Sequence, residues 1–367
     1  MSSVRLGGLR YRRCMSVPAP PLLAALHAVG LGLLMTGAVA SNEVPDLAGQ
    51  RADLSAFFKP SVVLNDGEWR QVDRGDVVVR VLHSQNPGLA IFAVSALAAS
   101  AETVAAKVGR IAELKTSAFV LGIQRFSDPP ALEDLAALTL DDGDLADLRT
   151  CRPGDCGLKL AAVEMAALRR VIVSAGADWK PAVQDAFRRL MLERVVAYQT
   201  GGVRSLPDDH DQASPVSRSR EFAAILAASP DLQQHLPQLA AYLSDYPRVA
   251  MTGVESFVYW SMERFGGKPV AMITHVSILR GSGPDVPALV IAGTQVFASH
   301  YMTGGLSLTA VVAGPKGAPN YLVYVNRLRV DALGGIAGGV KRAIVERRIR
   351  RSTGELITGL RRRLEAP

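Results

Sequence analysis

The sequence predicts an α+β fold with an antiparallel sheet, and three observations support this prediction. Two β-rich stretches flank a long region whose apolar residues recur at helical spacing, and the chain closes with an amphipathic, basic segment. The predicted strands of the second stretch are separated by short turns, whereas parallel neighbours would need a long crossover. With 367 residues, 49% of them hydrophobic, the chain can bury a sizeable core.

The first β-rich stretch follows a short lead-in that ends at Glu68. Its strands are expected over 76–83, 89–96 and 118–123. Between the second and third strands the spacing of the apolar residues changes to that of a helix. Apolar residues separated by 4, 3 and 3 positions predict an amphipathic helix that begins after the cap residue Ser100. These apolar residues are Val104, Val108, Ile111 and Leu114.

Residues 127–248 are predicted to form a helical insertion or subdomain. Apolar residues recur at helical spacing in six segments, and turn-forming residues punctuate them. The segments are 132–138, 145–148, 160–173, 183–198, 222–227 and 236–243. The α+β domain is therefore expected to comprise residues 41–126 and 249–367.

The second β-rich stretch predicts five strands and a closing helix. The strands are expected over 257–263, 270–279, 289–298, 306–312 and 321–330. From 340 to 364 the apolar residues keep to one stripe and the cations to the other face, which predicts a long amphipathic helix. Gly354 and Gly359 each weaken this helix by about 1 kcal/mol relative to alanine, so packing must hold it in place.

The first forty residues resemble a secretory signal peptide. Four arginines precede a nearly unbroken apolar run over 22–40, which ends in the small-x-small pattern Ala38-Val39-Ala40. This pattern predicts cleavage between Ala40 and Ser41 and export to the periplasm or the extracellular space. The alternative is an uncleaved anchor, because nineteen residues can just span a bilayer.

The distribution of charge argues against a nucleic-acid partner. The net charge is +7, but residues 1–40 contribute +4 and residues 341–367 contribute +6, which leaves −3 for residues 41–340. The body is therefore slightly acidic. The basic face of 341–363 is either a solvated helix face or a contact with an anionic membrane surface.

The two cysteines of the mature chain predict a disulfide bond. Cys151 and Cys156 flank Pro153-Gly154, a pair that suits the centre of a type II turn. Such a turn brings its flanks together, and disulfides persist in oxidising compartments. Free thiols or a redox pair are the alternatives, although the spacing is not Cys-x-x-Cys.

Two local stretches resemble the START/Bet v 1-like (SRPBCC) superfamily of helix-grip proteins. One is Val94-Ser-Ala96, followed by Ala99-Ser-Ala-Glu-Thr-Val104, which runs on to Ile111-Ala-Glu-Leu-Lys115. The other is 333–364, where a glycine-rich entry leads into a helix rich in Arg and Leu. The resemblance implies a curved antiparallel sheet that grips the C-terminal helix, with a mostly apolar cavity between them for a lipid-like or aromatic ligand.

The functional prediction is an exported protein that binds a hydrophobic or amphipathic small molecule, such as a lipid, without cofactor or metal. The mature chain lacks the common nucleophile, phosphate-binding and zinc motifs, so no catalytic residue is assigned. Side chains expected to contact the ligand come from the second β-rich stretch: Glu255, Tyr259, His275, His300, Tyr301, Tyr324 and Arg327.

Two alternative functions remain open. One is an envelope hydrolase or cyclase-like enzyme that pairs His275 or His300 with Glu255 or Tyr301 for acid–base work. The other is a peripheral membrane-docking protein.

The acidic cluster Asp141-Asp-Gly-Asp144, with Asp147 nearby, suggests either calcium binding or helix capping. It lacks the spacing and the terminal Glu of an EF-hand loop, so capping of the helix N-terminus is the favoured interpretation.

Overall fold

The computed structural model describes residues 62–367, apart from residues 83, 85–87, 266–267, 282–285, 315–317 and 332–337. All of these residues belong to one compact unit that comprises 46–367. The predicted signal peptide over 1–40 and its cleavage site between Ala40 and Ser41 lie outside the described residues.

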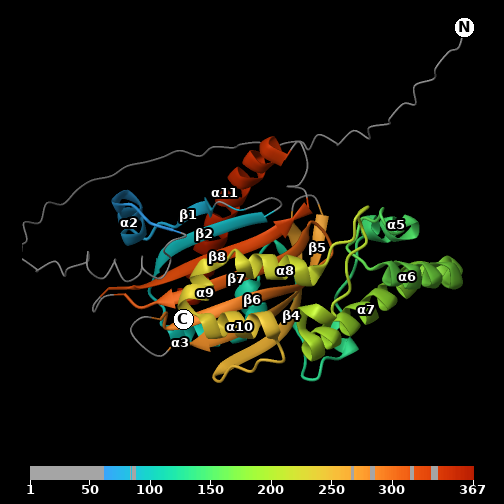
Figure 1. The fold of residues 1–367 in the computed structure, drawn as a ribbon, viewed down its shortest axis with the longest axis horizontal. Helices are drawn as coiled ribbons and strands as arrows, with labels where there is room; N and C mark the ends of the chain where they lie inside the picture. Colours follow the sequence, from blue (N-terminus) through green and yellow to red (C-terminus); the bar gives the residue numbers. More distant parts are fainter. Residues whose placement is uncertain are drawn as a thin grey trace, which may run out of the picture. The chain divides into compact units, whose positions relative to one another are not determined.

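The predicted α+β fold is confirmed, and its centre is one curved, eight-stranded antiparallel sheet (Figure 1). The strand order is β1-β2-β8-β7-β6-β5-β4-β3. The strands are β1 (Val78–Leu82), β2 (Gly88–Leu97), β3 (Val120–Arg125), β4 (Val254–Phe265), β5 (Lys268–Arg280), β6 (Leu289–Ala298), β7 (Met302–Val312) and β8 (Asn320–Val330). Strands β3 to β8 pair in chain order, and β2 returns to pair with β8.

The two faces of the sheet carry different helices because side chains alternate along each strand. In β4, Phe257 and Tyr259 pack with the helices that precede β3, whereas Val258 and Trp260 pack with the helices inserted after β3. We call the side that carries Phe257 and Tyr259 the α11 face and the side that carries Val258 and Trp260 the α8 face. Each is named after a helix that covers it. In Figure 1 the helices α8, α9 and α10 lie in front of the strands, and α11 passes behind β1 and β2.

Three helices pack on the α11 face: α3 (Ala101–Gly109), α4 (Ile111–Lys115) and α11 (Gly338–Glu365). Ser100 caps α3 as predicted, because its side chain accepts a hydrogen bond from the Thr103 amide. The single helix expected here is divided in two at Arg110, whose backbone is not helical.

The C-terminal helix α11 is held against the sheet at its C-terminal end. Ile357 and Leu364 are buried in a cluster with strand residues and with α3 and α4. Lys107 of α3 donates to the carbonyl of Arg363 at 3.0 Å, and the Glu365 carboxylate accepts from the Ala98 amide at 2.9 Å. The Lys107 contact satisfies a backbone carbonyl that the hydrogen bonds of α11 leave open, and the Glu365 contact ties the helix end to the residue that follows β2.

The α8 face is covered by α8 (Arg218–Ala227), α9 (Pro230–His235) and α10 (Pro237–Asp245), and, near β1, by α2 (Asp66–Asp73). Helix α2 begins near the end of the segment expected to be a lead-in and continues beyond it to Asp73. It begins with a capping box in which Asn65 and Glu68 exchange side-chain to backbone hydrogen bonds.

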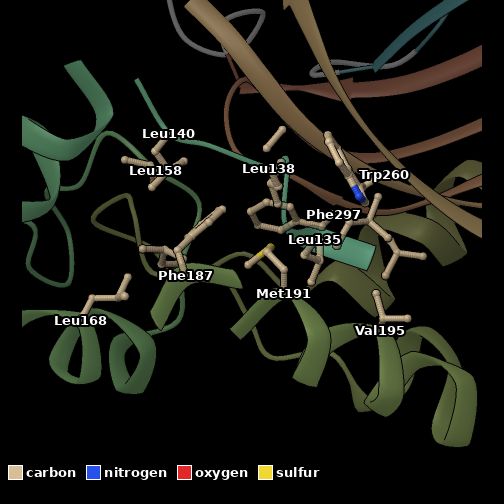
Figure 2. Packing of buried hydrophobic residues seen from close by; sticks show 14 of the residues in the cluster. Leu135, Leu138, Leu140, Leu158, Leu168, Phe187, Met191, Val195, Trp260 and Phe297 are labelled. Carbon is tan, nitrogen blue, oxygen red and sulfur yellow. The ribbon is translucent and has the colours of Figure 1, made fainter. Parts of the chain in front are cut away.

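The remaining inserted helices are α5 (Asp142–Thr150), α6 (Ala162–Ala175) and α7 (Trp179–Gly201), with 3-10 turns at Leu132–Leu135, Gly176–Asp178 and Gly202–Ser205. Their core is continuous with the sheet: Figure 2 shows Phe187 and Met191 of α7 near Trp260 and Phe297 of the strands. The helical insertion therefore shares a core with the sheet. No helix among the described residues combines the length and apolarity needed to cross a bilayer.

The disulfide predicted between Cys151 and Cys156 is confirmed by the distance between their sulfur atoms. Gly154 has a φ of +87°, as the third position of a type II turn requires, and the Asp155 amide donates to the Arg152 carbonyl. The sulfur pair is compatible with an oxidising compartment.

Replacing both cysteines with serine is expected to lower the free energy of unfolding by about 2 kcal/mol, because the reduced loop gains conformational entropy when it unfolds. Urea denaturation with and without dithiothreitol measures the effect. Dithiothreitol should shift the midpoint of the unaltered protein but not of the double variant, and an unchanged midpoint in the unaltered protein contradicts the prediction.

Candidate functional site

The structure does not bring the seven predicted ligand-binding residues together. Tyr259 and Tyr324 lie near each other on the α11 face. The other five lie on the α8 face, at the β6–β7 turn or at the exposed end of a strand: His275, Arg327, His300, Tyr301 and Glu255.

Glu255 and Arg327 each have a structural partner. The Glu255 carboxylate accepts from Arg280 at 2.6 Å on the surface. Arg327 is buried 3.7 Å from the Asp231 carboxylate, beside a closed cavity of about 20 Å³ under α9. That volume suits about one water molecule and is too small for a lipid.

His275 is buried among aromatic side chains on the α8 face. Its Nδ1 atom lies 2.9 Å from the Tyr198 hydroxyl, and its ring centroid lies 4.5 Å from that of Tyr246. Burial lowers the pKa of His275 to about 4, so the ring is neutral at physiological pH. Neither Glu255 nor Tyr301 is among the partners that the structure gives it.

His300 is fixed between two oxygen acceptors. Its Nδ1 atom lies 2.8 Å from the Gly157 carbonyl, and its Nε2 atom lies 3.0 Å from the Asp144 carboxylate. Tyr301 follows with a φ of 63°, and its ring centroid lies 5.7 Å from that of His300. Because both ring nitrogens of His300 are already engaged, this arrangement does not support the proposed acid–base pair.

The acidic cluster caps a helix, as favoured from the sequence. The Asp141 side chain accepts from the Asp144 amide at 2.8 Å at the start of α5. Asp144 is itself buried against His300, a role that the sequence did not indicate. No group of three or more metal-ligating side chains is assembled among the residues that the structure describes.

A titratable cluster on the α11 face contains both predicted tyrosines. The ammonium of Lys115, the last residue of α4, donates to the Tyr259 hydroxyl at 3.2 Å and to the Glu263 carboxylate at 2.5 Å. Ser261 donates to the same carboxylate at 2.7 Å. Tyr324 of β8 lies close enough to interact electrostatically with Lys115, Tyr259 and Glu263. We call these five residues the sheet-face recess.

The recess combines buried side chains, those of Tyr259 and Ser261, with partly exposed ones. Burial raises the pKa of Tyr324 to about 12, and although burial alone would lower the pKa of Lys115, its neighbours Tyr259 and Glu263 raise it. Yet the Lys115 side chain is 27% exposed and that of Glu263 is 22% exposed. Solvent therefore reaches part of the Lys115 and Glu263 side chains.

The surface around the recess is mostly polar. Residues paired directly across antiparallel strands share a face, and this places Thr274 beside Tyr259, Met272 beside Ser261, and Thr309 beside Tyr324. All three neighbours are partly exposed. The α11 face is thus more polar here than the family resemblance implied.

The recess offers hydrogen-bond donors to a ligand. An ammonium group has three donors, of which Lys115 uses two for Tyr259 and Glu263. The Tyr259 hydroxyl accepts from Lys115 and can donate its own hydrogen. Because the charges of Lys115 and Glu263 cancel, the recess suits a neutral oxygen acceptor such as a carbonyl or a hydroxyl.

Sequence reasoning missed Lys115, Ser261 and Glu263 as site residues, although a signal for Lys115 exists. Lys115 follows Ile111 by four residues, so it continues the apolar stripe of Val104, Val108 and Ile111. A lysine on the buried stripe of a helix needs a partner. Glu263 carries no comparable signal in the sequence.

Comparison with known proteins does not assign the chain to a family. No protein-family model matches it, and no curated protein matches it.

Proposed function

We propose that this protein is an exported binding protein for an amphipathic small molecule whose carbonyl or hydroxyl group enters the sheet-face recess. The observation that carries the proposal is Lys115, whose side chain is 27% exposed and whose ammonium has one donor beyond those that it uses for Tyr259 and Glu263. The signal-like residues before Ser41 and the Cys151–Cys156 pair support export.

The resemblance to helix-grip proteins is consistent with this proposal and stays a prediction. In the structure, α11 lies along β1 and β2 and packs at its C-terminal end against α3 and α4. Met272 and Leu328 supply apolar surface on the same face of the sheet. An apolar portion of the ligand would contact this surface while its polar group meets Lys115.

Binding of a ketone probe tests the proposal. The fluorescent ketone 6-propionyl-2-(dimethylamino)naphthalene carries one carbonyl acceptor on an apolar ring system. Replacing Lys115 with methionine is expected to weaken its binding about tenfold or more, because a hydrogen bond from a charged donor contributes about 1.5–3 kcal/mol. Replacing Tyr324 with phenylalanine removes a neutral hydroxyl and should have a smaller effect.

Lys180→Met is the matched control, because it makes the same substitution and likewise breaks one ion pair. Lys180 lies on an exposed part of α7, where it pairs with Asp142. The control should bind the probe as the unaltered protein does. The proposal is wrong if the unaltered protein does not bind the probe, or if the Lys115 and Lys180 variants bind it equally well.

A further inference from the structure

A second feature lies along the other flank of α11. A groove of about 860 Å³ runs between this helix, α2 and the start of β1. Residues 77–79, all valine, line it on the strand side, and Arg347, Arg350, Arg351 and Arg362 line it on the helix side. All four arginines are exposed. None of the recess residues lines this groove.

The groove carries an excess of positive charge. Its two carboxylates are already paired: Glu68 accepts from Arg80 at 2.8 Å, and Glu355 accepts from Arg351 at 3.1 Å. Within the described part of the chain, Arg347, Arg350 and Arg362 have no carboxylate at ion-pair distance. Three guanidinium groups are therefore available to an anion.

The walls of the groove are held in place. Arg361 donates to the Gly75 carbonyl and so ties α11 to the turn after α2. Gly354 lines the groove, and a Cβ atom added to it would lie 3.8 Å from a methyl group of Val79. Glycine in a helix interior is destabilising, and here it leaves the space between α11 and β1 unfilled.

We propose that this groove binds the headgroup of an anionic phospholipid and docks the protein on a membrane surface. Guanidinium groups bind phosphate oxygens through paired hydrogen bonds, and each cation near an anionic bilayer adds attraction. The valines next to the arginines suit the apolar part of a lipid just below its phosphate. This proposal rests on residues outside the recess, so it stands or falls independently of the ketone site.

Vesicle co-sedimentation tests the proposal. The protein should pellet with phosphatidylcholine vesicles that contain phosphatidylglycerol and not with phosphatidylcholine alone, and the binding should weaken as salt is added. The triple variant Arg347→Gln, Arg350→Gln, Arg362→Gln should lose roughly tenfold or more of its partition coefficient.

The control is Arg169→Gln, Arg170→Gln, Arg220→Gln, which removes the same charge from exposed positions on α6 and α8. It should bind vesicles nearly as the unaltered protein does. If both triple variants lost vesicle binding equally, net charge alone would explain the binding and the proposal would be wrong. It would also be wrong if the unaltered protein did not bind the vesicles.

Two further experiments test the shape of the groove and whether the bound phosphate belongs to a lipid or is a free anion. Gly354→Gln narrows the groove without changing the charge and favours the helix, so it should weaken vesicle binding while the protein stays folded. Inorganic phosphate, compared with chloride at equal ionic strength, should not displace the protein from vesicles. Full displacement by phosphate would identify a site for the free anion and contradict the lipid assignment.

Discussion

Replacing Asp209 with alanine is expected to lower the free energy of unfolding by about 3–5 kcal/mol. Asp209 is 0% exposed and accepts two hydrogen bonds from Arg218, at 3.1 and 2.7 Å. It also lies 4.0 Å from Arg194, whose guanidinium is paired with Glu164 of α6. Without Asp209, two buried guanidinium groups would share one carboxylate.

The network holds the loop that contains Asp209 against α6, α7 and α8. Burial lowers the pKa of Arg218, and the negative charge of Asp209 opposes that effect. Both guanidinium groups also stack over Phe297 of β6, at 5.0 and 5.3 Å from its ring centroid. Loss of the carboxylate therefore destabilises a junction of three helices and the sheet.

Thermal and urea denaturation measure this effect. Asp155→Ala is the control, because its ion pair with Arg152 is exposed and such pairs contribute little. Asp209→Leu combined with Arg218→Met should recover much of the lost stability, since apolar side chains often replace a buried ion pair at little cost. Equal stability of the Asp209 and Asp155 variants would contradict the network's role.

Replacing Trp260 with alanine is expected to cost about 3–5 kcal/mol, because it removes the largest side chain of a fully packed core. Trp260 is 1% exposed and lies between the sheet and the inserted segment, near Leu135 and Leu138 in Figure 2. Its indole Nε1 atom donates to the Asp134 carbonyl at 2.6 Å, and its ring covers the backbone at Gly122.

Two comparisons separate packing from hydrogen bonding at this position. Both variants leave the Asp134 carbonyl without its donor, but Trp260→Phe keeps an aromatic ring in the core. Its loss of stability should therefore be smaller than that of Trp260→Ala. Phe119→Ala removes an aromatic ring that is 63% exposed and should change the unfolding midpoint little. A Trp260→Ala variant as stable as the Phe119 variant would refute the shared core.

The sheet and most helices could be predicted from the sequence because their hydrophobic periods are strong. The cap residues Ser100 and Asp141 could also be predicted, because serine and aspartate are favoured at the position before a helix begins. Helix α2 was missed because it is short and polar, with only Trp69 and Val72 buried. Helix α9 was missed because six residues beginning at a proline carry too little periodicity.

The chemistry could be predicted only in part, because burial of charge depends on tertiary packing. Glu164 and Arg194 resemble ordinary exposed helix charges in the sequence, yet the structure buries both. Tyr259 and Tyr324 interact on one face although three strands separate β4 from β8 in the sheet, an approach between segments far apart in the chain. His275 points to the opposite face, since strand alternation separates it from Tyr259.

The most direct test of the central claim is the ¹³C-methyl NMR spectrum of the methionine-labelled protein as the ketone probe is added. Met272 lies opposite Ser261 on the face of the sheet that carries the recess, whereas Met191 is buried in α7 on the other face. The Met272 signal, assigned by its loss in Met272→Leu, should shift in proportion to bound probe while the Met191 signal stays fixed. A bound probe that moves Met191 and leaves Met272 unchanged would contradict the assignment of the binding site to the Lys115 recess.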